Sequence, residues 1–435
     1  MSLDRTLFYR YVAQTTDSPI GLEVDHAQGI YMYTPEGKRY IDLISGVTVS
    51  NVGHCHPHVV EAVSRQAAKY MHLMVYGEYI QSPQVRYAQH LAQLLPDGMD
   101  NVYFVNSGSE AVEGALKLAK RYTGRDEIIS MQNAYHGSTS GCLALMGNEA
   151  FRYAFRPLAP NVRAIRFNSI DDLQCITRRT ACVILDPLQC ENGLVEPVPG
   201  YFKAMRKKCD ETGTLLVFDE VQTAFGRTGS MFYFQQCGIV PDIVVMAKAL
   251  GGGMPLGAFA ARPEVMTTFT HNPALGHITT FGGHPVSCAA GQAALEVLLG
   301  TAGASQKHDL ATSGSLEGQR VVTECRQASK SSNETCANEY TPLWLDADRK
   351  GRRYVEALRE HPQVKAIRHT GLFIAVDLAD EPTYYRLLDR FMDNGLVTDS
   401  FLYKLSSFRI APPLNITYDQ VDESIALLLR SLDEI

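Results

Sequence analysis

The chain has 435 residues, enough to bury a large core divided between one large and one small domain. Its net charge of −7 gives no basic surface of the kind that binds nucleic acid. Ten cysteines are scattered without a CxxC pair, which favours reduced thiols over a disulfide framework and predicts no metal site.

The N-terminal residues mix Asp4, Arg5 and Arg10 with aromatic side chains and lack the apolar stretch of a signal peptide. The uncharged run at residues 249–261 is too short and too rich in glycine and proline to cross a bilayer. We therefore expect a cytoplasmic protein with no membrane partner.

The pattern of elements predicts three segments. Residues 1–50 form an N-terminal segment assigned to the small domain, residues 51–297 alternate strands and helices as in a large α/β domain, and residues 298–435 return to the small domain. Residues 300–342 are rich in serine, threonine, glycine and glutamine without helical periodicity, which predicts a mobile insertion. A capping box at Thr417 and Gln420 should begin the last helix.

A serine- and glycine-rich stretch, residues 106–110, follows a predicted strand at residues 102–105. The helix expected next can end at Gly124, and its apolar face consists of Val112, Ala115, Leu116 and Ala119. Backbone N–H groups, two hydroxyls and the positive end of a helix dipole suit a phosphate. An ordinary N-cap, which Ser109 could supply, explains the same residues equally well.

Two later strands end in residues of opposite charge. Asp219 follows the apolar residues 215–218, and Lys248 follows residues 242–247 and precedes three glycines. We expect the two strands to be parallel neighbours, so both side chains should face the crevice outside the carboxyl ends of the strands. A helix-capping aspartate and a solvated lysine are the simpler alternatives.

A reactive amine and a carboxylate in one crevice match the needs of one cofactor. Burial lowers the pKa of a lysine and makes the neutral nucleophile accessible. Pyridoxal 5'-phosphate (PLP) needs an amine to hold its carbonyl carbon and a carboxylate to keep its ring nitrogen protonated. The chain thus carries three motifs: residues 106–110, Asp219 and Lys248. A fourth is the glycine-rich turn of residues 279–285, which begins with two threonine hydroxyls.

Together these motifs resemble the class III PLP-dependent aminotransferases, the group that includes ornithine, acetylornithine and 4-aminobutyrate aminotransferases. The resemblance covers almost the whole chain: residues 53–57, 107–109, 135–137, 215–257, 280–283 and 409–414. It implies fold type I of the PLP enzymes, an α/β fold. Such a fold has a large domain with a mostly parallel central sheet flanked by helices, and a smaller α+β domain.

The resemblance also implies roles for cofactor-binding residues. Lys248 would bond to the cofactor and then move a proton, while Asp219 would pair with the ring nitrogen. The phosphate would be held by Ser107, Gly108 and Ser109, and by Thr280 of the neighbouring subunit. The remaining contacts to the ring would come from Tyr135, His136 and Gln222.

For the substrate, the resemblance implies that Arg409 binds the α-carboxylate, because a guanidinium matches a carboxylate bidentately. Glu191 would be its exchangeable partner. Family members that act on 4-aminobutyrate, ornithine or acetylornithine commonly carry an arginine where this chain has Ser138, and that arginine grips the second carboxylate of 2-oxoglutarate. Recognition of a dicarboxylate by this chain is therefore not expected unless another cation replaces it.

The expected function is transfer of an amino group from an ornithine-like, acetylornithine-like or ω-amino acid donor to a 2-oxo acid. The expected assembly is a homodimer that shares each active site. A racemase or aminomutase on the same fold is one alternative, since it would use the same lysine. A family member that binds the cofactor without catalysis is another.

Overall fold

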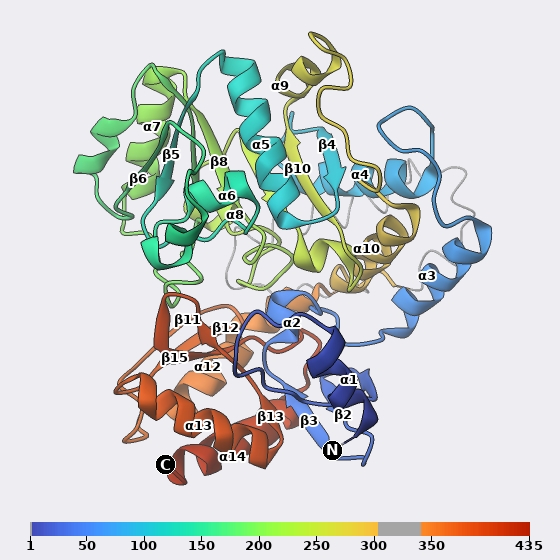
Figure 1. Ribbon diagram of the computed structural model, residues 1–435, viewed down its shortest axis with the longest axis vertical. Helices are drawn as coiled ribbons and strands as arrows, with labels where there is room; N and C mark the ends of the chain where they lie inside the picture. The colour runs from blue at the N-terminus through green and yellow to red at the C-terminus, as the bar shows by residue number, and fades with distance from the viewer. Residues whose placement is uncertain (1, 303–340) are drawn as a thin grey trace.

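The computed structural model describes residues 2–302 and 341–435. Figure 1 shows two parts, a large one above and a smaller one below that holds both ends of the chain. In the described residues, no helix is both long and apolar enough to cross a membrane.

A seven-stranded sheet forms the centre of the large part. Its strands lie in the order β4 (Asn101–Val105), β10 (Gly257–Ala261), β9 (Ile243–Met246), β8 (Leu215–Asp219), β7 (Thr180–Leu185), β5 (Glu127–Met131) and β6 (Val162–Ile165). Only β10 runs antiparallel to its neighbours, whereas β9, β8, β7, β5 and β6 pair in parallel. The four strands β7 to β10 are buried along their whole length, which is why they are almost continuously apolar.

Helices cover both faces of this sheet (Figure 1). They are α3 (Pro57–Lys69), α4 (Ser82–Leu94), α5 (Gly108–Thr123), α6 (Ser140–Leu145), α7 (Tyr201–Thr212), α8 (Phe234–Cys237), α9 (Pro263–Met266) and α10 (Pro285–Leu298). The apolar face predicted for α5 is buried, and Gly124 ends that helix with a φ of 68°. The helix does have an ordinary N-cap, but Ser107 supplies it and not Ser109: the Ser107 hydroxyl accepts the N–H of Glu110.

The small part contains two four-stranded sheets. One joins β1 (His26–Gln28), β2 (Tyr31–Tyr33) and β3 (Arg39–Asp42) to β13 (Leu396–Val397), and the other has the order β11 (Ala366–Thr370), β12 (Phe373–Asp377), β15 (Lys404–Ile410) and β14 (Ser400–Phe401). Its helices are α1 (Leu3–Tyr11), α2 (Ser45–Thr48), α12 (Ala347–Leu358), α13 (Glu381–Asn394) and α14 (Tyr418–Asp433). The predicted capping box of Thr417 and Gln420 begins α14.

The pairing of β3 with β13 joins the first 50 residues to the C-terminal region. The domain boundaries near residues 50 and 297 stay predictions. The insertion predicted at residues 300–342 lies outside the described residues except at its two ends.

The short element α2 is a left-handed turn. Ser45, Gly46, Val47 and Thr48 have φ angles of 52°, 60°, 61° and 63°. Such a backbone costs about 1–2 kcal/mol for each residue that has a side chain. Hydrogen bonds hold the turn in place: the Asp42 carboxylate accepts the N–H groups of Ile44 and Ser45 at 2.9 and 2.8 Å.

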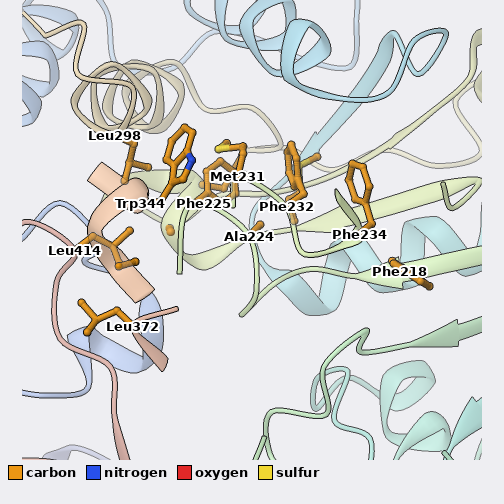
Figure 2. Packing of buried hydrophobic residues seen from close by; sticks show 14 of the residues in the cluster. Phe218, Ala224, Phe225, Met231, Phe232, Phe234, Leu298, Trp344, Leu372 and Leu414 are labelled. Carbon is orange, nitrogen blue, oxygen red and sulfur yellow. The ribbon is translucent and has the colours of Figure 1, made fainter. Parts of the chain in front are cut away.

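A buried arginine links the two parts. Arg227 donates to the carbonyls of Leu372 and Pro412 at 2.9 and 2.7 Å and to the side-chain oxygen of Asn51 at 2.7 Å. Burial lowers the pKa of Arg227 to about 9. Trp344 is buried in the apolar cluster of Figure 2, which also contains Leu298 and Leu414.

We predict that Gly371→Ala lowers the melting temperature much more than Gly37→Ala. Both glycines have positive φ, 62° and 81°, so both variants share the cost of left-handed backbone. A Cβ at Gly371 would lie 2.4 Å from the carbonyl carbon of Thr228, next to Arg227, whereas one at Gly37 meets nothing within 4 Å. Thermal unfolding of the two variants checks this, and equal melting temperatures would contradict it.

Candidate active site

A cavity of about 420 Å³ lies at the carboxyl ends of the central strands. Eight of the residues singled out in the sequence line it: Ser107, Gly108, Ser109, Tyr135, His136, Asp219, Gln222 and Lys248. They reach it because β4, β5, β8 and β9 run in the same direction and end at the same edge of the sheet.

Lys248 follows β9 in an uncommon backbone conformation. Its φ is 52°, in the left-handed region that residues with side chains seldom adopt. Burial lowers the pKa of its amine, an effect that the nearby Glu191 carboxylate only partly offsets. A strained backbone and a more accessible neutral amine together favour a reactive group over an ordinary surface charge.

A histidine and two carboxylates meet in the lining of the cavity. The Nδ1–H of His136 donates to Asp219 Oδ2 at 2.7 Å and lies 3.8 Å from Asp186 Oδ1. Burial alone would lower the pKa of His136, but the charge of Asp186 and the bond to Asp219 raise it overall. Burial also raises the pKa of Asp186 to about 7.

This cluster favours a positive charge next to Asp219. The ligand atoms of the three residues lie within 4.8 Å of one another, a spacing that a metal ion could also use. The short bond between His136 and Asp219 instead occupies the two atoms best placed for a metal, so we interpret the cluster as a hydrogen-bonded group. His136 Nε2 is buried and has no hydrogen-bond partner among the described residues.

The first turn of α5 and the residues before it also line the cavity. The Asn106 side chain donates to Glu110 Oε2 and to Thr279 Oγ1, both at 2.8 Å, and so ties the turn to the loop before α10. Gly257 lets β10 approach this turn, because a Cβ there would lie 2.1 Å from the carbonyl oxygen of Ser107. The free N–H groups of a helix N-terminus face the cavity here.

Arg409 and Glu191 form a buried ion pair at the small-domain side. The Nη2 and Nη1 atoms of Arg409 lie 3.1 and 3.4 Å from the two carboxylate oxygens of Glu191. Gln222 Nε2 and the backbone N–H of Leu402 also donate to Glu191, each at 2.9 Å. Burial would raise the pKa of Glu191, but Arg409 and Lys248 lower it to about 2.

A second carboxylate contacts the same arginine. Asp399 Oδ1 lies 2.6 Å from Arg409 Nε, and about a third of the Asp399 side chain is exposed. Burial of the rest raises the pKa of Asp399 to about 6, against the lowering effect of Arg409. Two carboxylates, those of Glu191 and Asp399, therefore pair with the one guanidinium of Arg409. Glu191 has the lower pKa and is the more fully ionised of the two.

Four of the predicted site residues do not line the cavity: Ser138, Thr280, Glu191 and Arg409. The Glu191–Arg409 pair is joined to the lining by the hydrogen bond from Gln222 to Glu191. Ser138 is exposed, with its hydroxyl 3.2 Å from that of Tyr135, and Thr280 is exposed in the loop before α10. Sequence reasoning missed Val49 and Asn106, which line the cavity, and Asp399. Asn106 directly precedes the serines of the predicted phosphate site, so its position was a usable signal. No sequence motif next to Val49 or Asp399 indicates a role in the site.

Comparison with known proteins decides the family. The family model described as "Aminotransferase class-III" matches residues 11–313. The chain belongs to the class III aminotransferases. The family and its relatives favour amino transfer over the isomerase and non-catalytic alternatives.

This class III enzyme is similar to acetylornithine aminotransferases over 62–94% of its length. It is 32% identical to an acetylornithine aminotransferase of Clostridium acetobutylicum over 94% of this chain and 95% of that one. It is 42% identical to the acetylornithine aminotransferase of Methanocaldococcus jannaschii over 62% of this chain and 68% of that one.

Solved structures agree on the fold. An ornithine aminotransferase of Toxoplasma gondii has a TM-score of 0.82 at 24% identity and covers 99% of this chain and 94% of its own. The acetylornithine aminotransferase of Elizabethkingia anophelis has a TM-score of 0.77 at 27% identity over 99% and 98%. The fold is type I of the PLP-dependent aminotransferases, as predicted, with a mostly parallel central sheet.

Proposed function

We propose that this class III aminotransferase uses PLP to transfer an amino group from an ornithine-like, acetylornithine-like or ω-amino acid donor to a 2-oxo acid. The observation that carries the proposal is the placement of Lys248, strained and partly buried, in one cavity with Asp219 and the first turn of α5. The names of the relatives above support the choice of donor.

The cavity residues fit this cofactor. Lys248 supplies an amine, the Asp219–His136 pair supplies a carboxylate for a ring nitrogen, and the turn that starts at Ser107 supplies donors for a phosphate. Two buried atoms without partners among the described residues, His136 Nε2 and Gln222 Oε1, lie on residues that line the same cavity. When bound, PLP supplies an aldehyde that takes up the amino group and a ring that withdraws electrons.

The chain's own groups would then handle the proton and the substrate. The Lys248 amine, with its lowered pKa, takes the proton from the donor carbon as a general base and returns it as a general acid. Asp219 would hold the proton on the ring nitrogen, and the hydrogen bond from His136 orients its carboxylate. Tyr135, which lines the cavity, would supply an aromatic contact to the ring.

Arg409 binds the α-carboxylate of the substrate when Glu191 moves aside. Glu191 remains satisfied after this exchange, because Gln222 and the N–H of Leu402 still donate to it. The exchange therefore replaces one carboxylate by another on the same guanidinium, which keeps a buried charge paired throughout.

The acceptor is a monocarboxylic 2-oxo acid such as pyruvate. A serine at position 138 has no charge with which to hold a second carboxylate, and its hydroxyl lies beside that of Tyr135. Asp399, whose Oδ1 lies 2.6 Å from Arg409 Nε, is a second carboxylate beside this arginine, which further disfavours a dicarboxylate.

The enzyme acts as a cytoplasmic homodimer in which Thr280 reaches the phosphate of the neighbouring subunit. Exposed apolar side chains next to Thr280 support this assembly: Phe281 is 52% exposed, and Met71 and Ile80 in the loop between α3 and α4 are 65% and 95% exposed. The ring centroids of His72 and Phe281 lie 4.8 Å apart, so the two loops form one surface. A sizing column coupled to an activity assay checks this; an active monomer would refute the sharing.

The half-reaction tests the proposed activity. We expect the enzyme, given ornithine, N-acetylornithine or 4-aminobutyrate without an oxo acid, to convert one equivalent of donor and stop, with the absorbance of the cofactor shifting to that of its amine form. Lys248→Ala should slow this step at least about 10³-fold. Asp219→Asn should slow it about 10²-fold or more while the cofactor stays bound.

The matched control is Lys203→Ala, which removes an exposed lysine of α7 and should change nothing. Continued turnover of donor without an oxo acid would indicate a racemase or aminomutase. Unchanged turnover by Lys248→Ala would show that the catalytic assignment is wrong.

For the acceptor, we predict that Ser138→Arg raises the ratio of kcat/KM for 2-oxoglutarate to that for pyruvate by about 10-fold or more. A bidentate arginine–carboxylate pair contributes about 1.5–3 kcal/mol. Ser140→Arg adds the same charge two residues away on α6 and should leave the ratio unchanged. A wild-type enzyme that already prefers 2-oxoglutarate would show that another cation holds the second carboxylate.

A further inference from the structure

The guanidinium of Arg409 is contacted on every side. Its Nη atoms face Glu191, Nη2 also donates to the carbonyl of Ser400 at 2.7 Å, and Nε faces Asp399 at 2.6 Å. Its carbon Cζ lies 4.7 Å from the centre of the Phe401 ring. Only 3% of the arginine is exposed, so its direction is set by these four contacts.

The two carboxylates on this arginine have different supports. Glu191 accepts hydrogen bonds from Gln222 and from the N–H of Leu402, so it keeps partners when it leaves Arg409. Asp399 Oδ1 has no hydrogen-bond partner among the described residues, and the ion pair with Arg409 is the contact it makes. Glu191 can therefore exchange with another carboxylate, whereas Asp399 stays with the arginine.

The backbone holds Asp399 next to the arginine. The N–H of Arg409 donates to the carbonyl of Asp399 at 3.0 Å, and the Thr398 hydroxyl donates to the carbonyl of Arg409. β14 and β15 form a hairpin that keeps these residues side by side. Asp399 thus approaches from the Nε edge, opposite the edge that Glu191 occupies.

We propose that Asp399 is a positioning residue that fixes the Nε edge of Arg409, so that its two Nη groups stay aimed at a substrate carboxylate when Glu191 leaves. The inference rests on the proposed role of Arg409 as the carboxylate-binding residue. It assigns Asp399 a part in the choice between carboxylate-bearing and carboxylate-free substrates. Asp399 itself touches no substrate.

The test measures the binding of propionate, a monocarboxylate that has no amine and cannot react, to the cofactor-loaded enzyme by calorimetry. Asp399→Ala should weaken binding about 10-fold, because a guanidinium that loses its contact at Nε is held less well in the orientation for bidentate binding. Asp399→Asn should restore Kd to within about 3-fold of wild type, since its side-chain oxygen can occupy the same place beside Nε. Asp393→Ala, which removes an exposed acid of α13, is the control and should leave Kd unchanged.

Kinetics with a matched pair of donors give a second readout. Asp399→Ala should raise KM for ornithine about 10-fold, change its kcat less than about 3-fold, and leave KM for 1,4-diaminobutane, which lacks the carboxylate, unchanged. A melting temperature within about 2 °C of wild type would exclude unfolding as the cause.

The outcomes separate this inference from the proposed function. If Arg409→Ala leaves the Kd of propionate unchanged, or wild type does not bind it, the role of Arg409 is wrong. If Arg409→Ala abolishes binding but Asp399→Ala does not weaken it, the role of Asp399 is wrong. A rise in KM confined to 1,4-diaminobutane would mean that Asp399 binds a substrate ammonium, which also overturns the inference.

Discussion

The parallel pairing of β8 with β9 is the constraint on which the active site depends. Asp219 pairs with Val245, so the first residues after both strands meet at one edge of the sheet. β7 and β5 run in the same direction and bring Asp186 and His136 to that edge. Because all of these strands are fully or almost fully buried, the chain cannot shift their register without exposing apolar side chains, and the polar groups stay where the sheet places them.

Buried charge is the second constraint. Glu191, Asp219 and Arg409 are nearly inaccessible to water, and each is paired with a group of opposite charge or with a hydrogen-bond donor. An unpaired charge in this setting would cost several kcal/mol. The chemistry proposed here therefore proceeds by exchange of partners, in which one carboxylate replaces another, rather than by release of a bare ion.

Local sequence was sufficient to predict the positions of the site residues that directly follow strands or begin helices. Lys248 and Asp219 stand directly after apolar runs, so their meeting followed from the rule that parallel strands end at one edge. The N-cap of α5 is Ser107, whereas the sequence also allowed Ser109, because both serines satisfy the capping pattern and only the backbone angles distinguish them. The type of element was predictable, whereas the choice between neighbouring residues was not.

Residues that act through distant contacts could not be predicted. Asp399 reaches Arg409 only through the register of the β14–β15 hairpin, and Val49 reaches the cavity only through the left-handed turn before it. Thr280 lies away from the cavity of its own chain, so its proposed role depends on a second subunit. In each case the missing information was a tertiary or quaternary contact, which hydrophobic periodicity does not record.

At the turn of residues 45–48, thermal stability and the shape of the active-site cavity place opposite demands on the backbone. Its unfavourable backbone persists because Asp42 and the C-terminal strand region anchor it. Substitutions that let residues 45–48 return to negative φ would stabilise the protein and would be favoured in a selection for thermal stability. The same change of backbone would move Val49 away from the cavity that it lines. A more stable turn at this position would therefore come with a cavity that fits its substrate less well.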